Sequence, residues 1–311
     1  MKTTTKILIV LALILGLCSY LAVDVYQFAP KRYSTRYVEL SSADIPSQLN
    51  DMNILYFSDL DYGTFMNEDR LNKLIDKINA LSPDVIIFGG DLYDTGAQYT
   101  EEGNTILTKA FSSLKADYGK YAVYGDSDER SDVMKSAIDQ IYAASNFEVI
   151  NNKSISLHKQ SSGSITLVGL DNEVNGKPDI DTVYSTVSRD SYVMTVCHTP
   201  DTALSVPADI TNYFLAGHSH GGQVYYFFGA LYQPAGAKEY LRGTHTISDK
   251  FTLDITNGVG TTIKDIRFLA DAEVVMYKLK HTDGTDTTST QSSTAAPTPT
   301  ASSTETSDTQ Q

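Results

Sequence analysis

The chain has 311 residues, of which 41% are hydrophobic, a composition typical of a globular protein with one sizeable α/β core. Its 38 Asp and Glu residues outnumber the 24 Lys and Arg residues, which gives a formal net charge of −14 at pH 7. This balance excludes a nucleic-acid partner, because binding to a phosphate backbone requires a basic face and no basic run is present.

The N-terminal segment is predicted to be a membrane anchor. Lys2 and Lys6 precede the uncharged, mostly apolar residues 7–23, about 17 residues, which is enough for a short membrane span. Such a segment is either a signal peptide or a signal anchor, and no clear small-x-small cleavage site follows it. We therefore expect residues 1–32 to form an uncleaved, single-pass anchor with a short linker.

Residues 33–280 alternate between helical and strand patterns and are expected to form one domain. Apolar residues recur at helical spacing after a predicted cap at Asn67, namely Leu71, Leu74, Ile75, Ile78 and Leu81. Further helices are predicted over residues 100–114 and 131–144. The second of these has an expected inward face of Val133, Met134, Ala137, Ile138 and Ile141. Additional strands are predicted over residues 164–169, 223–228, 251–255 and 273–280.

Chemically reactive side chains follow five apolar runs at the points where strands are expected to end. Asp59 and Asp61 follow residues 54–57, and the later runs are followed by Asp91, Asp126, Ser127, Asp128, His198, His218 and His220. Taken singly, each Asp is more often a helix cap or turn former, and His198 is more often a satisfied strand-end histidine. Functional groups gather at the carboxyl ends of strands in α/β sheets. The ordered series therefore predicts one shared metal site.

The last of these clusters is Gly217-His218-Ser219-His220-Gly221-Gly222-Gln223, and with the others it resembles the calcineurin-like metallophosphoesterases. The ordered motifs of that family are Asp-x-His, Gly-Asp, Gly-Asn-His-Asp/Glu, a lone His and Gly-His-x-His. The resemblance covers about residues 53–280 and, through residues 229–232, 240–243 and 266–268, indicates the YkuE-like, membrane-anchored subgroup. It implies a four-layer α/β/β/α sandwich.

The resemblance also implies two divalent metal ions that share one carboxylate. The first would be held by Asp59, Asp61, Asp91 and His220, and the second by Asp91, Asp126, His198 and His218. The ions could be Mn, Mg, Zn, Fe or Ca. The implied activity is hydrolysis of a phosphate ester or pyrophosphate bond, with Ser127 and Asp128 at the family's catalytic positions.

Three positions depart from the family pattern: Asp61 replaces His, Asp126 replaces Asn and Ser127 replaces His. Four coordinating carboxylates cancel the charge of two divalent ions, which predicts weaker phosphate attraction and a shift toward oxygen-preferring ions. Ser127 cannot protonate a leaving group near neutral pH, which predicts slow cleavage of poor leaving groups. The departures also motivate an alternative, a catalytically degenerate protein that binds metal or an envelope ligand.

Signals for the substrate and the location are few. Arg242 and Arg267 are expected to bind substrate phosphate, with a surface or fold-stabilising ion pair as the alternative for each. The expected substrate is a phosphorylated small molecule or a lipid-linked phosphate, and the expected state is a monomer. A lipid-binding use of the aromatic run Tyr225, Tyr226, Phe227 and Phe228 is a further alternative, although such a run also suits a buried strand.

The C-terminal residues 281–311 are rich in Ser and Thr and contain Pro297 and Pro299. Such a composition cannot form a packed core and resembles flexible extracellular tails. We therefore expect a disordered tail, and a folded domain on the outer face of a bacterial cell membrane.

Overall fold

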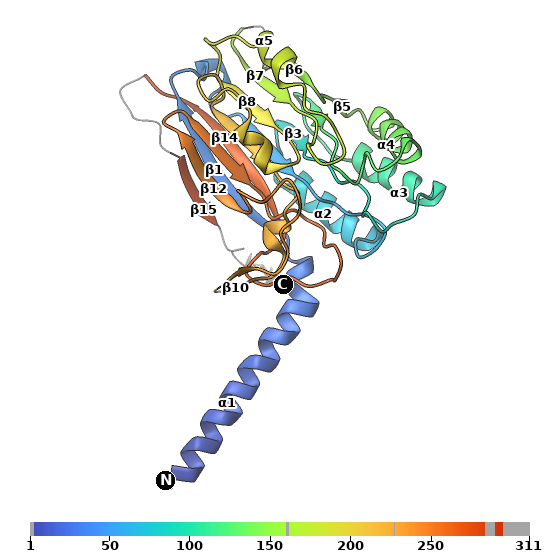
Figure 1. Cartoon of the computed structure of the whole chain (residues 1–311), viewed down its shortest axis with the longest axis vertical. Coiled ribbons are helices and arrows are strands. Elements are labelled where there is room, and N and C mark those ends of the chain that lie inside the picture. The colour runs from blue at the N-terminus through green and yellow to red at the C-terminus, as the bar shows by residue number, and fades with distance from the viewer. Residues whose placement is uncertain (1–2, 160–161, 227, 284–289, 295–311) are drawn as a thin grey trace, which may run out of the picture.

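The computed structural model of the protein describes residues 3–159, 162–226, 228–283 and 290–294. Its first element is a long apolar helix, α1 (Thr3–Val23), which projects away from the rest of the structure and buries none of its residues (Figure 1). A π turn (Asp24–Phe28) and a 3₁₀ turn (Ala29–Lys31) continue it into the domain. The helical stretch Thr3–Lys31 is long and apolar enough to cross a membrane.

The first sheet has seven strands in the order β15-β1-β14-β2-β3-β4-β5. Their bounds are β1 Ser34–Ser42, β2 Asn53–Phe57, β3 Val85–Phe88, β4 Lys120–Ala122, β5 Glu148–Val149, β14 Glu273–His281 and β15 Thr290–Thr294. Strands β2 to β5 pair in parallel, so their carboxyl ends lie at one edge of the sheet. Helices α2 (Glu68–Ala80), α3 (Glu101–Ser112) and α4 (Asp132–Ala144) cover its outer face (Figure 1).

The second sheet has six strands in the order β12-β13-β9-β8-β7-β6. Their bounds are β6 Lys153–His158, β7 Ser164–Gly169, β8 Val193–Val196, β9 Tyr213–Ala216, β12 Gly243–Ser248 and β13 Phe251–Ile255. Strands β7, β8, β9 and β13 pair in parallel. Helix α5 (Ile180–Ser185) and a 3₁₀ turn (Pro200–Leu204) pack on the outer face of this sheet.

Three hydrophobic clusters separate the layers. One lies between helices α2 to α4 and the first sheet, one between the two sheets, and one between the second sheet and α5. The predicted four-layer α/β/β/α sandwich is confirmed. Helix α2 begins at the expected cap, Asn67, and α3 and α4 begin next to Thr100 and Ser131, where the predicted helices start. The side chain of each of these three residues accepts a backbone N–H from the first turn.

Three expectations from the sequence need correction. The expected strand over residues 223–228 is shorter: Gln223 has a φ of 54°, Val224 makes an isolated bridge with Phe268, and β10 (Tyr225–Tyr226) pairs with β11 (Gly229–Ala230). Phe227 lies outside the described residues. Val133 is 67% exposed, because it lies in the first turn of α4 at the edge of the apolar stripe. Within the expected tail, Thr290–Thr294 pair with the open edge of β1 as β15.

A buried ionic network joins the two sheets. Arg36 on β1 donates to both carboxylate oxygens of Asp254 on β13, at 3.0 and 2.9 Å. Asp254 is fully buried and also accepts hydrogen bonds from Tyr277 (2.6 Å) and Tyr213 (3.2 Å). Burial lowers the pKa of Arg36, but Asp254 and Glu273 raise that pKa by more, so its charge is retained. The network thus fixes how one sheet lies on the other.

Replacing Asp254 should destabilise the fold far more than replacing one of its hydroxyl partners. Asp254→Ala leaves the buried Arg36 guanidinium with Glu273 as its remaining counter-charge and removes the acceptor of two tyrosine hydroxyls, which we expect to cost about 3–5 kcal/mol of unfolding free energy. Tyr213→Phe removes one hydrogen bond and should cost about 1 kcal/mol. Urea unfolding of the full chain in detergent, followed by circular dichroism, measures both. Equal losses would contradict a specific role for the ion pair.

Candidate metal centre

All the predicted metal ligands lie on loops that follow parallel strands, where the edges of the two sheets meet. Asp59 and Asp61 follow β2, Asp91 follows β3 and Asp126 follows β4 in the first sheet. His198 follows β8, and His218 and His220 follow β9 in the second sheet. The first sheet therefore supplies the carboxylates and the second sheet supplies the imidazoles.

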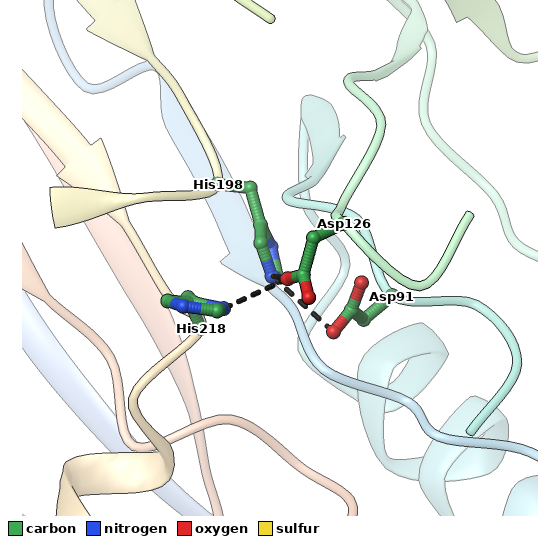
Figure 2. A group of neighbouring side chains, drawn as sticks. All are labelled: Asp91, Asp126, His198 and His218. Carbon is green, nitrogen blue, oxygen red and sulfur yellow. Dashed lines mark ion pairs between the residues drawn. The ribbon is translucent and has the colours of Figure 1, made fainter. Parts of the chain in front are cut away.

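One half of the centre is formed by Asp91, Asp126, His198 and His218, whose ligand atoms all lie within 4.8 Å of one another. Nε2 of His198 lies 3.3 Å from Oδ2 of Asp91 and 3.3 Å from Oδ1 of Asp126. Nδ1 of His218 lies 2.9 Å from the same Asp126 oxygen. Figure 2 shows the four side chains pointing toward one another from opposite sides.

The other half is formed by Asp59, Asp61 and His220. Nε2 of His220 lies 3.5 Å from Oδ2 of Asp61 and 3.9 Å from Oδ1 of Asp59. The same Asp59 oxygen lies 3.9 Å from Nε2 of His198, so the two halves adjoin. The structure thus brings together every residue for which the sequence predicts metal coordination.

Two backbone carbonyls orient the imidazoles, and nothing in the sequence signals either of them. Nδ1 of His198 donates to the carbonyl of Gly89 at 2.7 Å, and Nε2 of His218 donates to the carbonyl of Ala235 at 2.5 Å. Each bond fixes the proton on that nitrogen and directs the opposite nitrogen at the carboxylates, where it can bind a metal once it has lost its proton. Outer contacts of this kind are typical of metal-binding histidines.

Several polar atoms at the centre lack a hydrogen-bond partner within the described part of the chain. They include Oδ2 of Asp61, Oδ1 of Asp126 and Nε2 of His198, all buried. An unsatisfied buried polar atom costs about 1–3 kcal/mol, so such a group of atoms needs a further partner. Carboxylate oxygens and imidazole nitrogens are the ligands that divalent metals take. The residues present therefore fit divalent metal binding.

The backbone at the centre is held in an unusual conformation. Most of the ligands have left-handed φ values, namely Asp59 (56°), Asp61 (52°), Asp91 (58°), His218 (67°) and His220 (51°). Such values are uncommon for non-glycine residues and cluster at functional sites. Glycines make room for the ligands: a Cβ on Gly125 would lie 2.0 Å from Oδ1 of Asp91, and one on Gly217 would lie 2.6 Å from Oδ2 of Asp59.

The charges of the cluster strongly shift the pKa values of its side chains. Burial lowers the pKa of His198, but Asp91 and Asp126 raise it more, so its pKa lies well above the usual value. Burial raises the pKa of Asp126, but the adjacent imidazoles of His198 and His218 lower that pKa by more, so the net shift is downward. Burial and the charges of Asp91 and Asp59 raise the pKa of Asp61 well above its usual value. His198 and Asp61 thus keep their protons to a higher pH than usual when no metal is bound.

Asp128 binds backbone groups and contacts no predicted ligand side chain by hydrogen bond. Its carboxylate accepts N–H groups from Asp91 (2.9 Å), Leu92 (2.8 Å) and Gly125 (2.8 Å), and its side chain is fully buried. Burial, then the charge of Asp91, raises its pKa to about 7. Asp128 therefore joins the loops after β3 and β4, a positioning arrangement that differs from the catalytic contact expected from the sequence.

Ser127 lies directly against Asp91. Its N–H donates to Oδ1 of Asp91 at 2.9 Å, and its hydroxyl lies 3.2 Å from Oδ2 of Asp91 and 2.6 Å from the hydroxyl of Thr95. The side chain is buried. Ser127 is therefore at the centre, as expected, and its contacts hold the carboxylate that is predicted to be shared.

The structure does not support phosphate binding by Arg267. Its guanidinium is fully buried and donates to the carbonyls of Ala270 (2.7 Å), Asn257 (2.8 Å) and Gly260 (2.6 Å). Because these carbonyls bind both terminal nitrogens of the guanidinium, Arg267 stabilises the fold. Arg242 donates to the carbonyl of Leu269 at 2.8 Å and lines a cavity that contains none of the predicted metal ligands.

The same residues match a known family model. A model described as calcineurin-like phosphoesterase matches residues 52–222, which include every predicted metal ligand. The chain is also 28% identical over 255 residues to the uncharacterized metallophosphoesterase YkuE of Bacillus subtilis (strain 168), a match that covers 82% of this chain and 88% of that protein.

Two further relatives are longer than this chain. The uncharacterized metallophosphoesterase Cj0846 of Campylobacter jejuni is 25% identical over 257 residues, which cover 82% of this chain and 66% of that protein. A transmembrane protein with metallophosphoesterase domain from Bos taurus is 26% identical over 224 residues, which cover 64% of this chain and 49% of that protein. The chain thus spans about half the length of the bovine relative.

Asp91→Asn should weaken Mn²⁺ binding at least about 100-fold, since loss of even an outer partner typically costs 10–100-fold. Asp94→Asn is the matched control, because Asp94 is as buried as Asp91 (4% and 5% exposed) but is not a predicted ligand. Isothermal titration of the full chain in detergent measures the affinity. Unchanged binding in Asp91→Asn would refute the ligand assignment.

Metal binding should release protons and become tighter as the pH rises. The raised pKa values of His198 and Asp61 mean that both groups keep their protons to a higher pH than usual without metal, and coordination requires that these protons leave. Titrating Mn²⁺ in buffers of different ionisation enthalpy counts the protons released. Binding heats that do not depend on the buffer would contradict coordination by these groups.

Proposed function

Since the chain belongs to the calcineurin-like phosphoesterase family, we propose that it is a membrane-anchored hydrolase that uses two divalent metal ions to cleave a phosphate ester or pyrophosphate bond. The proposal rests on one observation above all: carboxylates and imidazoles from five loops converge with their buried polar atoms unsatisfied. Burying such charged groups together is costly unless an ion of opposite charge compensates them.

Asp91 is the residue proposed to bind both ions. Asp126, His198 and His218 complete one ligand set with it, and Asp59, Asp61 and His220 complete the other. When bound, two ions of this kind supply Lewis acidity toward a phosphoryl oxygen and toward water. The chain itself supplies a rigid frame, because Asp128, Ser127 and the carbonyls of Gly89 and Ala235 hold the ligands.

The set of four carboxylates is expected to modify this chemistry. Asp59, Asp61, Asp91 and Asp126 together carry as much negative charge as two divalent ions carry positive charge, so the loaded centre attracts phosphate less strongly. Oxygen-rich ligand sets are preferred by Mn, Mg and Ca. We therefore propose Mn²⁺ or Mg²⁺ as the working ions.

Ser127 is proposed to limit the range of substrates. Its hydroxyl is engaged with Asp91 and Thr95 and is too weak an acid to protonate a leaving group near neutral pH. A leaving group must therefore depart without protonation from this position, which favours substrates whose leaving groups are good, such as phosphoanhydrides and activated esters.

The second candidate function is metal or ligand binding without turnover. It is favoured by the contacts of Ser127, which occupies the family's imidazole position and whose hydroxyl is already hydrogen-bonded to Thr95 and Asp91. In that case the centre would bind metal with normal affinity and release no phosphate.

The proposed location is the outer face of a cell membrane, with α1 as a single span and the domain as a monomer. Support comes from the apolar helix, from relatives that include a transmembrane metallophosphoesterase-domain protein, and from the Ser/Thr-rich C-terminal sequence. The proposed substrates are phosphorylated small molecules or lipid-linked phosphates that occur there.

Ser127→His should raise turnover of an ester with a poor leaving group by about 10²-fold, since general acid assistance is typically worth 10²–10⁴. Turnover of bis-p-nitrophenyl phosphate should change much less, because its leaving group needs no proton. Ser127→Ala is the control that removes the hydroxyl without adding an imidazole. Normal metal binding with no hydrolysis in any of these proteins would favour the second candidate.

A further inference from the structure

The end of the anchor helix is fixed to the domain. The backbone N–H of Arg267 donates to the carbonyl of Val25 at 3.3 Å, and the guanidinium of Arg70 donates to the carbonyl of Pro30. Leu21 of α1 lines the same cavity, of about 540 Å³, as Phe268 and Leu269. The face of the domain that contains residues 266–269 therefore lies where the polypeptide leaves its apolar span.

A short hairpin is bonded to that same face. The N–H of Tyr225 donates to the carbonyl of Phe268 at 2.9 Å, and the N–H of Phe268 donates to the carbonyl of Gln223 at 3.0 Å. Strand β10 consequently lies beside the end of α1 (Figure 1). The side chain of Gln223 also donates to the carbonyls of Thr262 and Lys264, which brings residues 262–264 to the hairpin.

Large apolar side chains on these segments point to solvent. We call them the basal surface: Phe228 (93% exposed), Leu231 (67%), Ile263 (68%) and Leu269 (62%). The aromatic run of the hairpin is thus not a buried strand, since Phe228 is almost wholly exposed. Tyr26 and Phe28, at the end of the anchor, are also exposed, as is usual for aromatic residues at a membrane interface.

The charges beside the basal surface suit an anionic lipid headgroup although the chain as a whole is acidic. Lys31 and Lys264 are exposed there. Of the three neighbouring carboxylates, Asp265 pairs with Arg70 at 2.9 Å, and Asp24 and Asp271 share Arg32. Exposed Lys side chains near an anionic lipid surface favour membrane association.

We propose that the basal surface docks on the bilayer that α1 spans, with Phe228 and Leu231 inserted at the level of the lipid headgroups. Its continuity with the anchored helix identifies lipid as the occupant. The proposal rests on the membrane anchoring included in the proposed function, but not on hydrolysis. The docked hairpin lies between His220 and Ala235, and the carbonyl of Ala235 orients His218. The lipid contact is therefore made by the same loop that positions His218 and His220.

The chain contains no Trp, so a single introduced Trp reports its own surroundings. Full-length Phe228→Trp is placed in nanodiscs of phosphatidylcholine and phosphatidylglycerol, one copy per disc, with or without brominated acyl chains. Val133→Trp is the matched control, because Val133 is 67% exposed on α4, away from the anchor. Leu231→Trp replaces Phe228→Trp should the latter fail to fold.

The Phe228→Trp variant is expected to show blue-shifted emission, several-fold stronger quenching by bromolipid than the Val133→Trp variant, and weaker quenching by acrylamide. Equal quenching of the two variants would overturn the proposal. If the indole of the Phe228→Trp variant is shielded only in discs that hold two copies, the proposal is overturned, because the surface then contacts a second copy and not lipid. Loss of both variants from the discs would overturn the anchoring premise and the docking with it, whereas Mn²⁺-dependent hydrolysis would be unaffected.

Discussion

Mutual repulsion among buried carboxylates is the constraint around which this molecule is built. Asp59, Asp61 and Asp91 are almost fully buried within one cluster, and Asp126 is close to it. Imidazoles from the opposite sheet offset part of that charge, and divalent ions would offset the remainder. Holding such groups together requires left-handed backbone at most ligands, glycines where a Cβ would collide, and a carboxylate, Asp128, that fixes two loops.

Arg267 connects the two functional ends of the domain. Its backbone N–H binds the carbonyl of Val25 at the end of the anchor, while its side chain binds carbonyls of Gly258 and Gly260 next to Asp59 and Asp61, and that of His220. The membrane-proximal face and the metal centre are therefore parts of one hydrogen-bonded unit. Arg267, which the sequence predicts to bind substrate phosphate, joins the end of the anchor to the metal centre in the structure.

The sequence predicts those structural features that depend on residues close to one another in the chain. Helix caps at Asn67, Thr100 and Ser131 act within one turn, and a residue that follows a parallel strand reaches the same sheet edge as its neighbours. It does not predict that Asp128 directs both oxygens at backbone amides, or that Gly89 and Ala235 orient the imidazoles, since these contacts depend on loops packed together in space. An aromatic run in the sequence also does not show whether its side chains are buried, since Phe228 is exposed.

Anomalous scattering at the manganese edge, from crystals grown with Mn²⁺, would examine the shared-carboxylate centre without reference to any substrate. Two peaks about 3.5–4 Å apart, with Asp91 between them, are the expected result. A single peak confined to Asp126, His198 and His218, or no peak among these residues, would contradict a centre of two metal ions.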